Sequence, residues 1–423
     1  MLYHSLTDRT LTRSFADAVV EGLAPDKGLY YPERIPSLPQ DFWLSDEDLN
    51  PWDLGAAMMA PLAEGALSHD ELHAMLKEVL NFPLDLHEIE DNVYALELFY
   101  GPTHAFKDVG ARFLSRVLRK VSDKRLTILV ATSGDTGSAV AQGFLNAPNI
   151  DVVILYPQGR ISHIQEQQLT TAGANIKALE VEGAFDDCQA MVKAAFLDAD
   201  LQAQRPLTSA NSINIARWMP QSIYYAWATY LLGQPAQFSV PSGNVGNLAA
   251  GVLAAQMGMP HAGFIASTNA NDGLASHLRG DAFQPRPSVA TLSNAMDVGD
   301  PSNLPRLQAL FGGDIAAMRA TVKGAKLHDA GTMKVMKEVL DRTGYVMCPH
   351  TAVGYAGLME YRNPDVPGVV LATAHPAKFG EVVERATDHT PDVPDHLAEC
   401  LNKTKEATVI APYYETLKAH LLG

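Results

Sequence analysis

The chain has few cysteines: Cys188, Cys348 and Cys400 are the only three among 423 residues. They are odd in number, far apart in the sequence, and lack the close spacing of zinc ligands. This scarcity argues against a disulfide framework and against a metal site. It also favours a reducing compartment, because chains in oxidising compartments are often held together by disulfides.

Positive charge is also in short supply. Lys and Arg number 32 against 48 Asp and Glu, which gives a net charge of −16 and an isoelectric point near 5.3. Nucleic-acid-binding proteins usually show the opposite balance, so we expect no nucleic-acid partner. An acidic protein that binds an anionic small molecule has to supply positive potential locally, from helix N-termini and a few Arg or Lys side chains.

Long apolar runs are missing from the sequence. The longest, such as residues 369–374, are too short to cross a bilayer, and residues 1–10 lack the apolar core of a signal peptide. We therefore expect a cytoplasmic protein with no membrane partner. With 47% hydrophobic and 19% charged residues, the composition is typical of a globular chain that is long enough for two or three domains.

Short apolar runs alternate with helical stretches from about residue 125 onward. Runs at 126–131, 151–156 and 176–181 are each followed by a helical stretch, and residues 237–268 and 333–374 repeat the alternation. Such alternation predicts parallel strands in a doubly wound α/β sheet. Residues 1 to about 80 have a helical, polar pattern instead. Within them, His69 and His73 indicate a solvated helix face, because a zinc-protease helix needs Glu rather than Asp70 after its first His.

A single lysine stands out in the stretch Phe99–Asp108, directly after a Gly-Pro turn. From Val109 onward the apolar residues recur at helical spacing, so Lys107 begins an amphipathic helix. The positive potential of a helix start and a nearby apolar face both disfavour an ammonium group. They therefore lower the pKa of the lysine and make its amine nucleophilic. An ordinary first-turn lysine on a solvated surface remains the alternative for this stretch alone.

Residues 242–247, with the sequence Ser-Gly-Asn-Val-Gly-Asn, follow the predicted strand at 237–240 and open a helix. Two glycines allow close approach of the backbone to a ligand, and the N–H groups of a helix start attract an anion. The loop has the form of a phosphate cradle, although it matches neither the Walker pattern nor the dinucleotide pattern. A plain turn between strand and helix is the alternative.

Three further loops lie near strand ends, where ligands bind in open α/β sheets. Residues 132–138 combine small hydroxyl side chains with a helix start that suits a carboxylate or a second anion. Residues 211–217 place Asn211 and Arg217 where both can reach one phosphate, with a helix cap and a surface arginine as the alternative reading. Residues 373–378 end the last buried strand, and His375 by itself is more often structural than catalytic.

Taken together, these stretches resemble the threonine synthase family. Residues 101–108 (Gly-Pro-Thr-His-Ala-Phe-Lys-Asp) resemble its pyridoxal-phosphate lysine motif, residues 242–247 its cofactor-phosphate loop, and residues 22–30 its N-terminal segment. The resemblance continues through residues 298–303 to His375 and covers nearly the whole chain in order. A lysine motif followed by this Gly-Asn loop is specific to the fold type II group of pyridoxal-phosphate enzymes. The form of the lysine motif narrows the resemblance to bacterial and fungal-like threonine synthases.

The resemblance implies an α/β fold of type II, with two doubly wound parallel-sheet domains and a helical N-terminal segment. It also implies the domain boundaries. We expect the helical segment over residues 1–80, a large cofactor-binding domain over 81–110 and 235–423, and a small substrate-side domain over 111–234.

The resemblance further implies a role for each site residue. Lys107 is expected to bind pyridoxal 5'-phosphate as a Schiff base and to act as the catalytic base, and no metal is expected. The expected cofactor-binding residues are Lys107, Gly243, Asn244, Val245, Gly246, Asn247 and Thr373, with Thr373 at the pyridine nitrogen. The expected substrate-binding residues are Thr132, Ser133, Gly134, Asp135, Thr136, Asn211, Ser212 and Arg217, the last three around the phosphate of the substrate. The role of residues 300–303 stays open.

The activity implied by the resemblance is the conversion of the small molecule O-phospho-L-homoserine and water to L-threonine and phosphate. A serine or threonine dehydratase of the same fold is one alternative, but it needs no second phosphate pocket, so residues 211–217 argue against it. A non-catalytic ligand-binding relative is the other alternative, and the presence of Lys107 argues against that. The sequence leaves a monomer and a homodimer equally open.

Overall fold

The N-terminal unit contains a small sheet as well as helices, in the computed structural model, which describes residues 1–44 and 47–423. Strand β1 (Leu2–Ser5) pairs antiparallel with β2 (Thr12–Ser14) and with β3 (Tyr30–Pro32). The expectation of a purely helical segment over residues 1–80 was therefore wrong for its first third. Strands of three or four residues carry too few positions for a visible alternation of apolar and polar side chains.

Four helices complete this unit: α1 (Phe15–Glu21), α2 (Gln40–Trp43), α3 (Pro51–Met59) and α4 (His69–Val79). Helix α4 begins with a capping box, in which Ser68 and Glu71 each accept a hydrogen bond from the backbone N–H of the other. His69 is exposed and His73 is partly exposed, with its Nε2 atom 2.8 Å from Oδ1 of Asp53. Among the described residues, no group of three or more His, Cys, Asp or Glu side chains is placed to hold a metal ion.

The larger sheet has six strands in the order β12-β11-β10-β13-β5-β4. Every neighbouring pair is parallel except the pair of edge strand β4 with β5. Its strands are β4 (Asp85–Glu90), β5 (Val93–Glu97), β10 (Ala236–Pro241), β11 (His261–Thr268), β12 (Val322–Lys326) and β13 (Gly368–Ala372). Strands β10 and β13 lie at the centre, and strands were expected at both places, at residues 237–240 and within the apolar run at 369–374.

The smaller sheet has five strands in the order β14-β8-β7-β6-β9, and all of its pairs are parallel. Its strands are β6 (Leu126–Ala131), β7 (Ile150–Pro157), β8 (Ile176–Val181), β9 (Leu207–Thr208) and β14 (Thr408–Ile410). The first three agree with the apolar runs in the sequence. Strand β14 lies within residues 235–423, which were expected to belong to the other domain, yet it pairs with β8.

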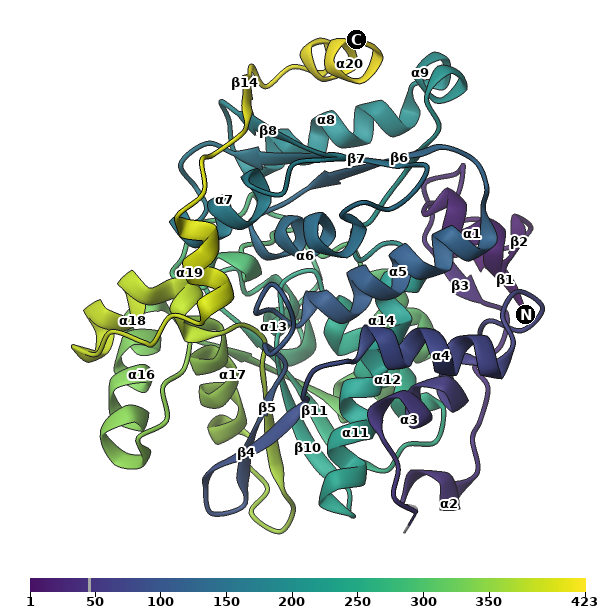
Figure 1. The fold of residues 1–423 in the computed structure, drawn as a ribbon. Helices are drawn as coiled ribbons and strands as arrows, with labels where there is room; N and C mark the ends of the chain where they lie inside the picture. Colours follow the sequence, from purple (N-terminus) through teal and green to yellow (C-terminus); the bar gives the residue numbers. More distant parts are fainter. Residues whose placement is uncertain (45–46) are drawn as a thin grey trace.

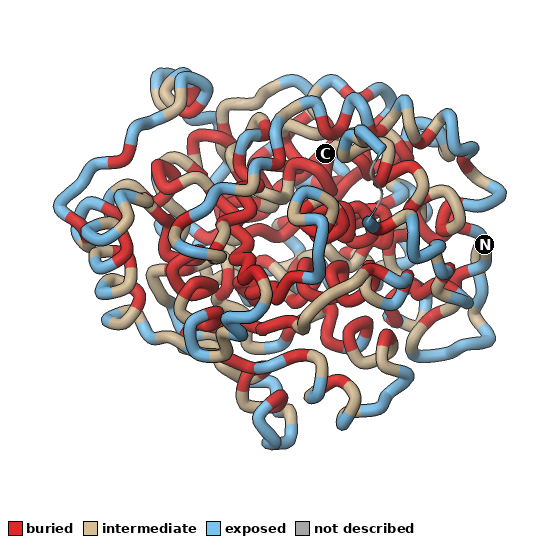
Figure 2. The backbone as a smooth tube through the Cα atoms, turned by 90° about the horizontal axis from the view of Figure 1, so that it is seen from below, coloured by how far each residue is buried: buried red, intermediate tan, exposed pale blue. Residues whose placement is uncertain are grey.

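Helices cover both sheets, and two of them lie between the sheets. Figure 1 shows the smaller sheet above α6 (Asp135–Phe144) and the larger sheet below it, with α5 (Lys107–Val121) crossing beside α6, which it contacts. Helix α5 buries Val109, Phe113 and Val117 at helical spacing and has basic residues in its last turn, as the pattern predicted. Figure 2 shows buried residues concentrated along the middle of the molecule.

The remaining helices are α7 (His163–Thr170), α8 (Phe185–Leu197), α9 (Ala199–Gln204), α10 (Ile215–Trp218), α11 (Ser222–Leu232), α12 (Gly246–Gln256), α13 (Gly273–Arg279), α14 (Leu304–Leu310), α15 (Ile315–Thr321), α16 (Asp329–Thr343), α17 (Pro349–Glu360), α18 (Gly380–Thr387), α19 (Asp395–Leu401) and α20 (Tyr414–Leu422), with 3-10 turns η1 (Met219–Gln221), η2 (Asn294–Met296) and η3 (Pro376–Phe379). None of the helices in the described ranges has the length and apolarity to cross a membrane.

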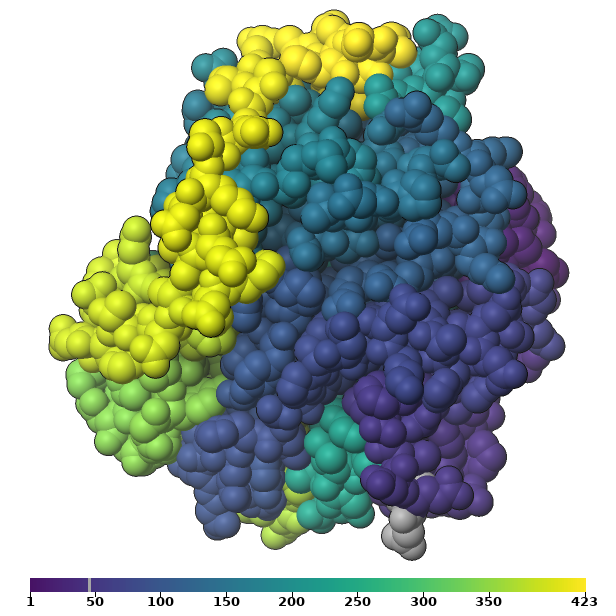
Figure 3. Space-filling view, in the orientation of Figure 1, coloured from purple at the N-terminus to yellow at the C-terminus, as the bar shows by residue number. Residues whose placement is uncertain are grey.

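The C-terminal segment joins the two halves of the molecule. After α18 the chain runs through α19 to β14 and α20, along one side of the molecule, in yellow in Figures 1 and 3. Helix α19 contacts α7, and α20 contacts α8. Leu417 and Leu421 of α20 are buried in the core that includes β6, β7 and β8.

Candidate active site

The loop before α5 is built to present Lys107, the first residue of that helix. Asp108 accepts hydrogen bonds from the backbone N–H and the hydroxyl of Thr103, at 2.8 and 2.7 Å, which closes the loop on itself. The backbone N–H of Phe106 donates to the carbonyl of Thr373 at 2.9 Å. The lysine therefore lies next to the end of β13, one of the central strands of the larger sheet.

The amine of Lys107 is less basic than that of an ordinary lysine. Burial lowers the pKa of Lys107 to about 8, and the cationic groups of Arg217 and Lys378 act in the same direction. The carboxylate of Asp135 opposes this shift. An amine with a pKa near the working pH is available both as a nucleophile and as a base.

Residues 242–247 form the turn between β10 and α12, as the sequence predicted. A Cβ atom added at Gly243 would lie 2.9 Å from the carbonyl oxygen of Ala295, and one at Gly246 would lie 3.2 Å from Cβ of Ser212. Val245, just before α12, has a φ of 65°, a left-handed conformation that is rare for a β-branched residue. Such strain costs on the order of 1–3 kcal/mol and is typical of ligand-binding loops.

This loop is braced by residues 300–303, whose role the sequence left open. Oδ1 of Asn244 accepts hydrogen bonds from the backbone N–H and the hydroxyl of Ser302, and its carbonyl accepts from the backbone and side chain of Asn303. The side chain of Asn303 also donates to the hydroxyl of Ser212 at 2.9 Å. The buried guanidinium of Arg306 donates to Asn303 and to the carbonyl of Ser212. Ser302, Asn303 and Arg306 therefore hold the loop at 242–247 and the loop at 211–217 together.

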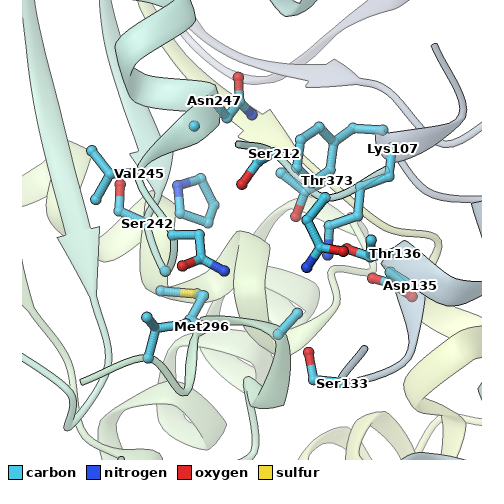
Figure 4. Close-up of a pocket in the computed structure, with 18 of the residues that line it drawn as sticks. Lys107, Ser133, Asp135, Thr136, Ser212, Ser242, Val245, Asn247, Met296 and Thr373 are labelled. Atoms are coloured by element: carbon cyan, nitrogen blue, oxygen red, sulfur yellow. The ribbon is translucent and has the colours of Figure 1, made fainter. Parts of the chain in front are cut away.

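The loop between β6 and α6 supplies hydroxyl groups and a helix start. The hydroxyl of Thr132 accepts from the backbone N–H groups of Gly134 and Gly137, at 3.0 and 2.8 Å, so Thr132 caps the helix. The hydroxyls of Ser133 and Thr136 make no hydrogen bond within the described part of the chain. Figure 4 shows the side chains of Lys107, Thr136 and Asp135 gathered on one side of the cavity, with Thr373 near Lys107.

Arg217 lies beside Lys107 in the same cavity and is buried. Its Nη1 atom donates to the carbonyl of Ala210 at 2.9 Å, but its Nε atom is buried without an acceptor. Burial lowers the pKa of Arg217 to about 10, so the guanidinium remains charged at neutral pH. The side-chain amide of Asn211 donates to the carbonyl of Ala131, and Oδ1 of Asn211 has no partner among the described residues. A buried cation with a free donor indicates a site for an anion.

One cavity brings these loops together. Its lining includes Lys107, residues 243–247, Thr373 and all of the expected substrate-side residues except Gly134. Gly134 instead has a φ of 128° at the start of α6, where a Cβ atom would collide with Gln165. Gly134 therefore shapes the turn rather than the wall of the cavity. Whether each lining residue contacts cofactor or substrate remains a prediction.

Three family models match the chain, and together they extend over nearly all of it. Residues 79–373 match the model of pyridoxal-phosphate-dependent enzymes, residues 2–79 the threonine synthase N terminus, and residues 351–421 the threonine synthase C-terminal region. Threonine synthase of Haemophilus influenzae is 44% identical over 380 residues, which cover 88% of each chain.

The chain belongs to the threonine synthase family.

Solved threonine synthases have the same fold. The crystal structure of the Escherichia coli threonine synthase is 40% identical, with a TM-score of 0.95, over 100% of this chain and 99% of that one. The pyridoxal-phosphate-bound threonine synthase of Brucella melitensis is 34% identical, with a TM-score of 0.92, over the same shares of the two chains. The fold type II assignment and the pyridoxal-phosphate cofactor expected from the sequence are thereby confirmed.

The cavity of this threonine synthase family member suits that cofactor. The start of α12 offers backbone N–H groups beside Gly243, where a Cβ atom would collide with backbone, and Gly246, where it would be tightly packed, and this suits a phosphate. The side-chain amide nitrogen of Asn247 is buried without an acceptor. The hydroxyl of Thr373 makes no hydrogen bond within the described residues, and the amine of Lys107 lies in the same cavity.

Two parts of the lining were missed in the sequence. His350, near the start of α17, accepts a hydrogen bond at Nε2 from the backbone N–H of Ala295, and burial lowers its pKa to about 4, which keeps the ring neutral. The segment that contains Ala295 and Met296 packs over Gly243 and completes the wall of the cavity. Pro349 at a helix start was the only local signal for His350, and such a signal marks a helix rather than a ligand site.

Proposed function

We propose that the protein converts O-phospho-L-homoserine and water to L-threonine and phosphate. The observation that carries this proposal is the buried guanidinium of Arg217, which forms no ion pair among the described residues and lines the same cavity as Lys107 and the loop at 242–247. A cofactor phosphate at residues 242–247 leaves the guanidinium free for a second anion. A substrate that carries its own phosphate supplies that anion.

Residues 243–247 are proposed to hold the cofactor phosphate, and Lys107 to bind its aldehyde carbon. The bound cofactor supplies an electron sink for the substrate carbons. With the cofactor bound, the free amine of Lys107 would accept the proton from Cα of the substrate. A pKa near 8 suits this role, because far more of the amine is neutral at neutral pH than in a lysine with the ordinary pKa of 10.5.

The substrate is proposed to lie between two polar loops. We propose that Ser133, Thr136 and the backbone N–H groups at the start of α6 hold its carboxylate, because the two hydroxyls are unengaged among the described residues and the helix start is positive. Asn211, Ser212 and Arg217 are proposed to hold its phosphate. The hydroxyl of Thr373 is proposed to face the pyridine nitrogen of the cofactor.

The three cysteines are free and buried, which supports our proposal of a reducing compartment, the cytoplasm.

The test is product analysis with two substrates. The purified holoprotein is offered phosphohomoserine or threonine in separate reactions, and phosphate, threonine and 2-oxobutyrate are measured. We expect equal amounts of phosphate and threonine from phosphohomoserine. Oxobutyrate from threonine, with no threonine from phosphohomoserine, would instead identify a dehydratase.

A second measurement tests the role of Lys107. Borohydride reduction of the holoprotein fixes the cofactor to its lysine, and peptide mapping then identifies that residue. We expect the adduct on Lys107, and Lys107→Ala should retain the fold but lose turnover by orders of magnitude. An adduct on Lys378, the other lysine next to the cavity loops, would overturn the assignment.

A further inference from the structure

Lys378 forms a buried ion pair with a residue of the cavity wall. Its Nζ atom lies 2.8 Å from Oδ1 of Asp135, and the two side chains are 0% and 4% exposed. Lys378 belongs to η3, directly after strand β13 of the larger sheet, whereas Asp135 begins α6 beneath the smaller sheet. The ion pair therefore connects the two halves of the molecule at the cavity.

Asp135 is the one acidic residue among those that line the cavity in the described part of the chain. Burial disfavours its ionisation, but the ammonium groups of Lys378 and Lys107 hold the pKa of Asp135 well below its usual range. It is therefore a carboxylate at neutral pH. Its charge stands in a cavity that also holds the cationic groups of Lys107 and Arg217 and the starts of α6 and α12, all of which suit anions.

An unpaired carboxylate at this position would oppose the proposed function in two ways. It would repel the carboxylate of an amino acid bound at the start of α6, in a setting where charges are poorly screened. It would also favour the ammonium form of Lys107 over the reactive amine, since the Asp135 carboxylate raises the pKa of that lysine. An ammonium group 2.8 Å away offsets both effects.

Lys378 also connects the loop that presents Lys107 with the start of α6. Besides its contact with Asp135, its ammonium donates to the carbonyl of Thr103 at 2.8 Å, in the loop that presents Lys107. Gln168 of α7 donates to the same carbonyl, and Gln165 donates to Oδ1 of Asp135 at 2.9 Å. The lysine loop and the start of α6 thus share one cation.

We propose that Lys378 is a positioning residue for the reaction, whose ammonium group neutralises Asp135 and fixes the start of α6 against the Lys107 loop so that an anionic amino acid can bind there. The proposal rests on the proposed function, because it requires an amino acid carboxylate at this loop. Lys378 acts through Asp135 and does not touch the reacting atoms.

A double-mutant cycle tests this role in holoprotein of full length. The variants are Lys378→Met, Asp135→Asn and the two combined. For each we measure the KM for phosphohomoserine, the Kd of L-alanine from the change in cofactor absorbance, and the thermal midpoint. In the native background we expect Lys378→Met to raise both the KM and the Kd by about tenfold or more, as the loss of a charge-assisted contact in a desolvated site does.

In the Asp135→Asn background, the same Lys378→Met change should alter the KM and the Kd several-fold less than in the native background, because no carboxylate remains to neutralise and only the contact with the carbonyl of Thr103 is lost. Equal effects in both backgrounds would overturn the proposal. Recovery of the thermal midpoint without recovery of the KM and the Kd would also overturn it, because the pair would then be structural only. Lys378→Arg should recover part of the loss, since the charge is retained.

A matched control is Lys405→Met. Lys405 pairs with Glu166 and Glu180, at 2.8 and 2.6 Å, and none of the three lines the cavity. We expect this variant to move the thermal midpoint but neither binding constant. Failure of the proposed function would be seen separately, as native protein that releases no threonine from phosphohomoserine, and alanine binding would still report on Lys378.

Discussion

Two cations, Arg217 and Lys107, face one cavity, and neither forms an ion pair among the described residues. Their charges are therefore available to ligands, and burial makes each interaction stronger than it is in water. The two cations suit different functions. Arg217 keeps its proton at neutral pH and offers hydrogen-bond donors in a fixed plane, which suits binding of an anion. Lys107 releases its proton near pH 8, and the neutral amine can then act as a nucleophile or a base.

The first prediction concerns Arg217. Arg217→Ala should leave the cofactor absorbance intact but raise the KM for phosphohomoserine, because a charge-assisted bond in a desolvated site contributes about 1.5–3 kcal/mol, roughly a ten- to hundredfold effect. Arg217→Lys should recover only part of the loss, since a point charge does not reproduce paired donors. Steady-state kinetics measure both variants.

L-Alanine, which has no phosphate, is the control ligand for Arg217. Its Kd should barely change in either variant. If alanine and phosphohomoserine weakened equally, Arg217 would support the fold rather than bind the phosphate.

The second prediction concerns pH. Uptake of pyridoxal phosphate by apoprotein requires the neutral amine of Lys107, so its rate should rise with pH with a midpoint near pH 8, not near the ordinary lysine pKa of 10.5. Asp135→Asn should move the midpoint to lower pH, because the carboxylate favours the ammonium form. Stopped-flow absorbance measures the rate, and a midpoint above pH 10 would contradict the assignment of this amine.

Single residues were predictable where a short motif surrounds them. Lys107 and Arg217 each lie near a helix start that the sequence pattern reveals, which made them candidates, and the family resemblance then assigned them to the site. His350 and the pairing of Lys378 with Asp135 did not, because each depends on a contact between segments far apart in the sequence. Buried ion pairs of this kind have no local pattern.

At the scale of elements, the loop at 242–247 also shows which features follow from local sequence and which depend on distant contacts. Its shape was predictable, since two glycines at the junction of a strand and a helix indicate close backbone approach. Its brace at 300–303 was recognised only as a loop, because the hydrogen bonds of Asn303 to Asn244 and Ser212 require the tertiary fold. The short strands β1 to β3 were missed for a different reason, namely their length.

The third prediction concerns Gly246. A Cβ atom there already lies 3.2 Å from Cβ of Ser212 and 3.3 Å from Nδ2 of Asn303, so Gly246→Val should push the loop away from its brace. Cofactor affinity should fall more than stability does. Titration of apoprotein with pyridoxal phosphate measures the affinity, and thermal unfolding of apoprotein measures the stability.

Gly273→Ala is the matched control, because a Cβ atom at this helix start meets only an ordinary contact of 3.4 Å with Phe283. It should change neither quantity by much. Unchanged cofactor affinity in Gly246→Val would remove the phosphate-binding role of this loop.

The molecule is built around two large sheets, and the strands of each sheet come from separate parts of the chain. The alternation of strands and helices predicted parallel strands in a doubly wound sheet, because many buried parallel strands are continuous apolar runs, and the resemblance implied the division into two sheets. It did not predict the return of the C-terminal segment to the smaller sheet, since three-residue β14 has no such run. The buried side chains of α20 complete the core of that sheet.

The fourth prediction concerns the packing of α20 against the smaller sheet. Leu417 is fully buried against the smaller sheet, so Leu417→Ala should cost about 2–5 kcal/mol of stability and lower the thermal midpoint. Leu422→Ala on the same helix is the control, because Leu422 is 44% exposed, and it should have little effect. Thermal unfolding followed by circular dichroism measures both variants. Equal midpoints would mean that α20 contributes little to the fold.

The pairing of β14 with β8 also sets an order for biosynthesis. Strand β8 ends at Val181 and its partner begins at Thr408, so the edge of β8 stays open while the ribosome makes everything between them. At roughly 5–20 residues per second, this interval lasts on the order of ten to fifty seconds. An open strand edge is a template for wrong pairing. The nascent chain therefore carries an open strand edge through much of its translation, until β14 is made and pairs with β8.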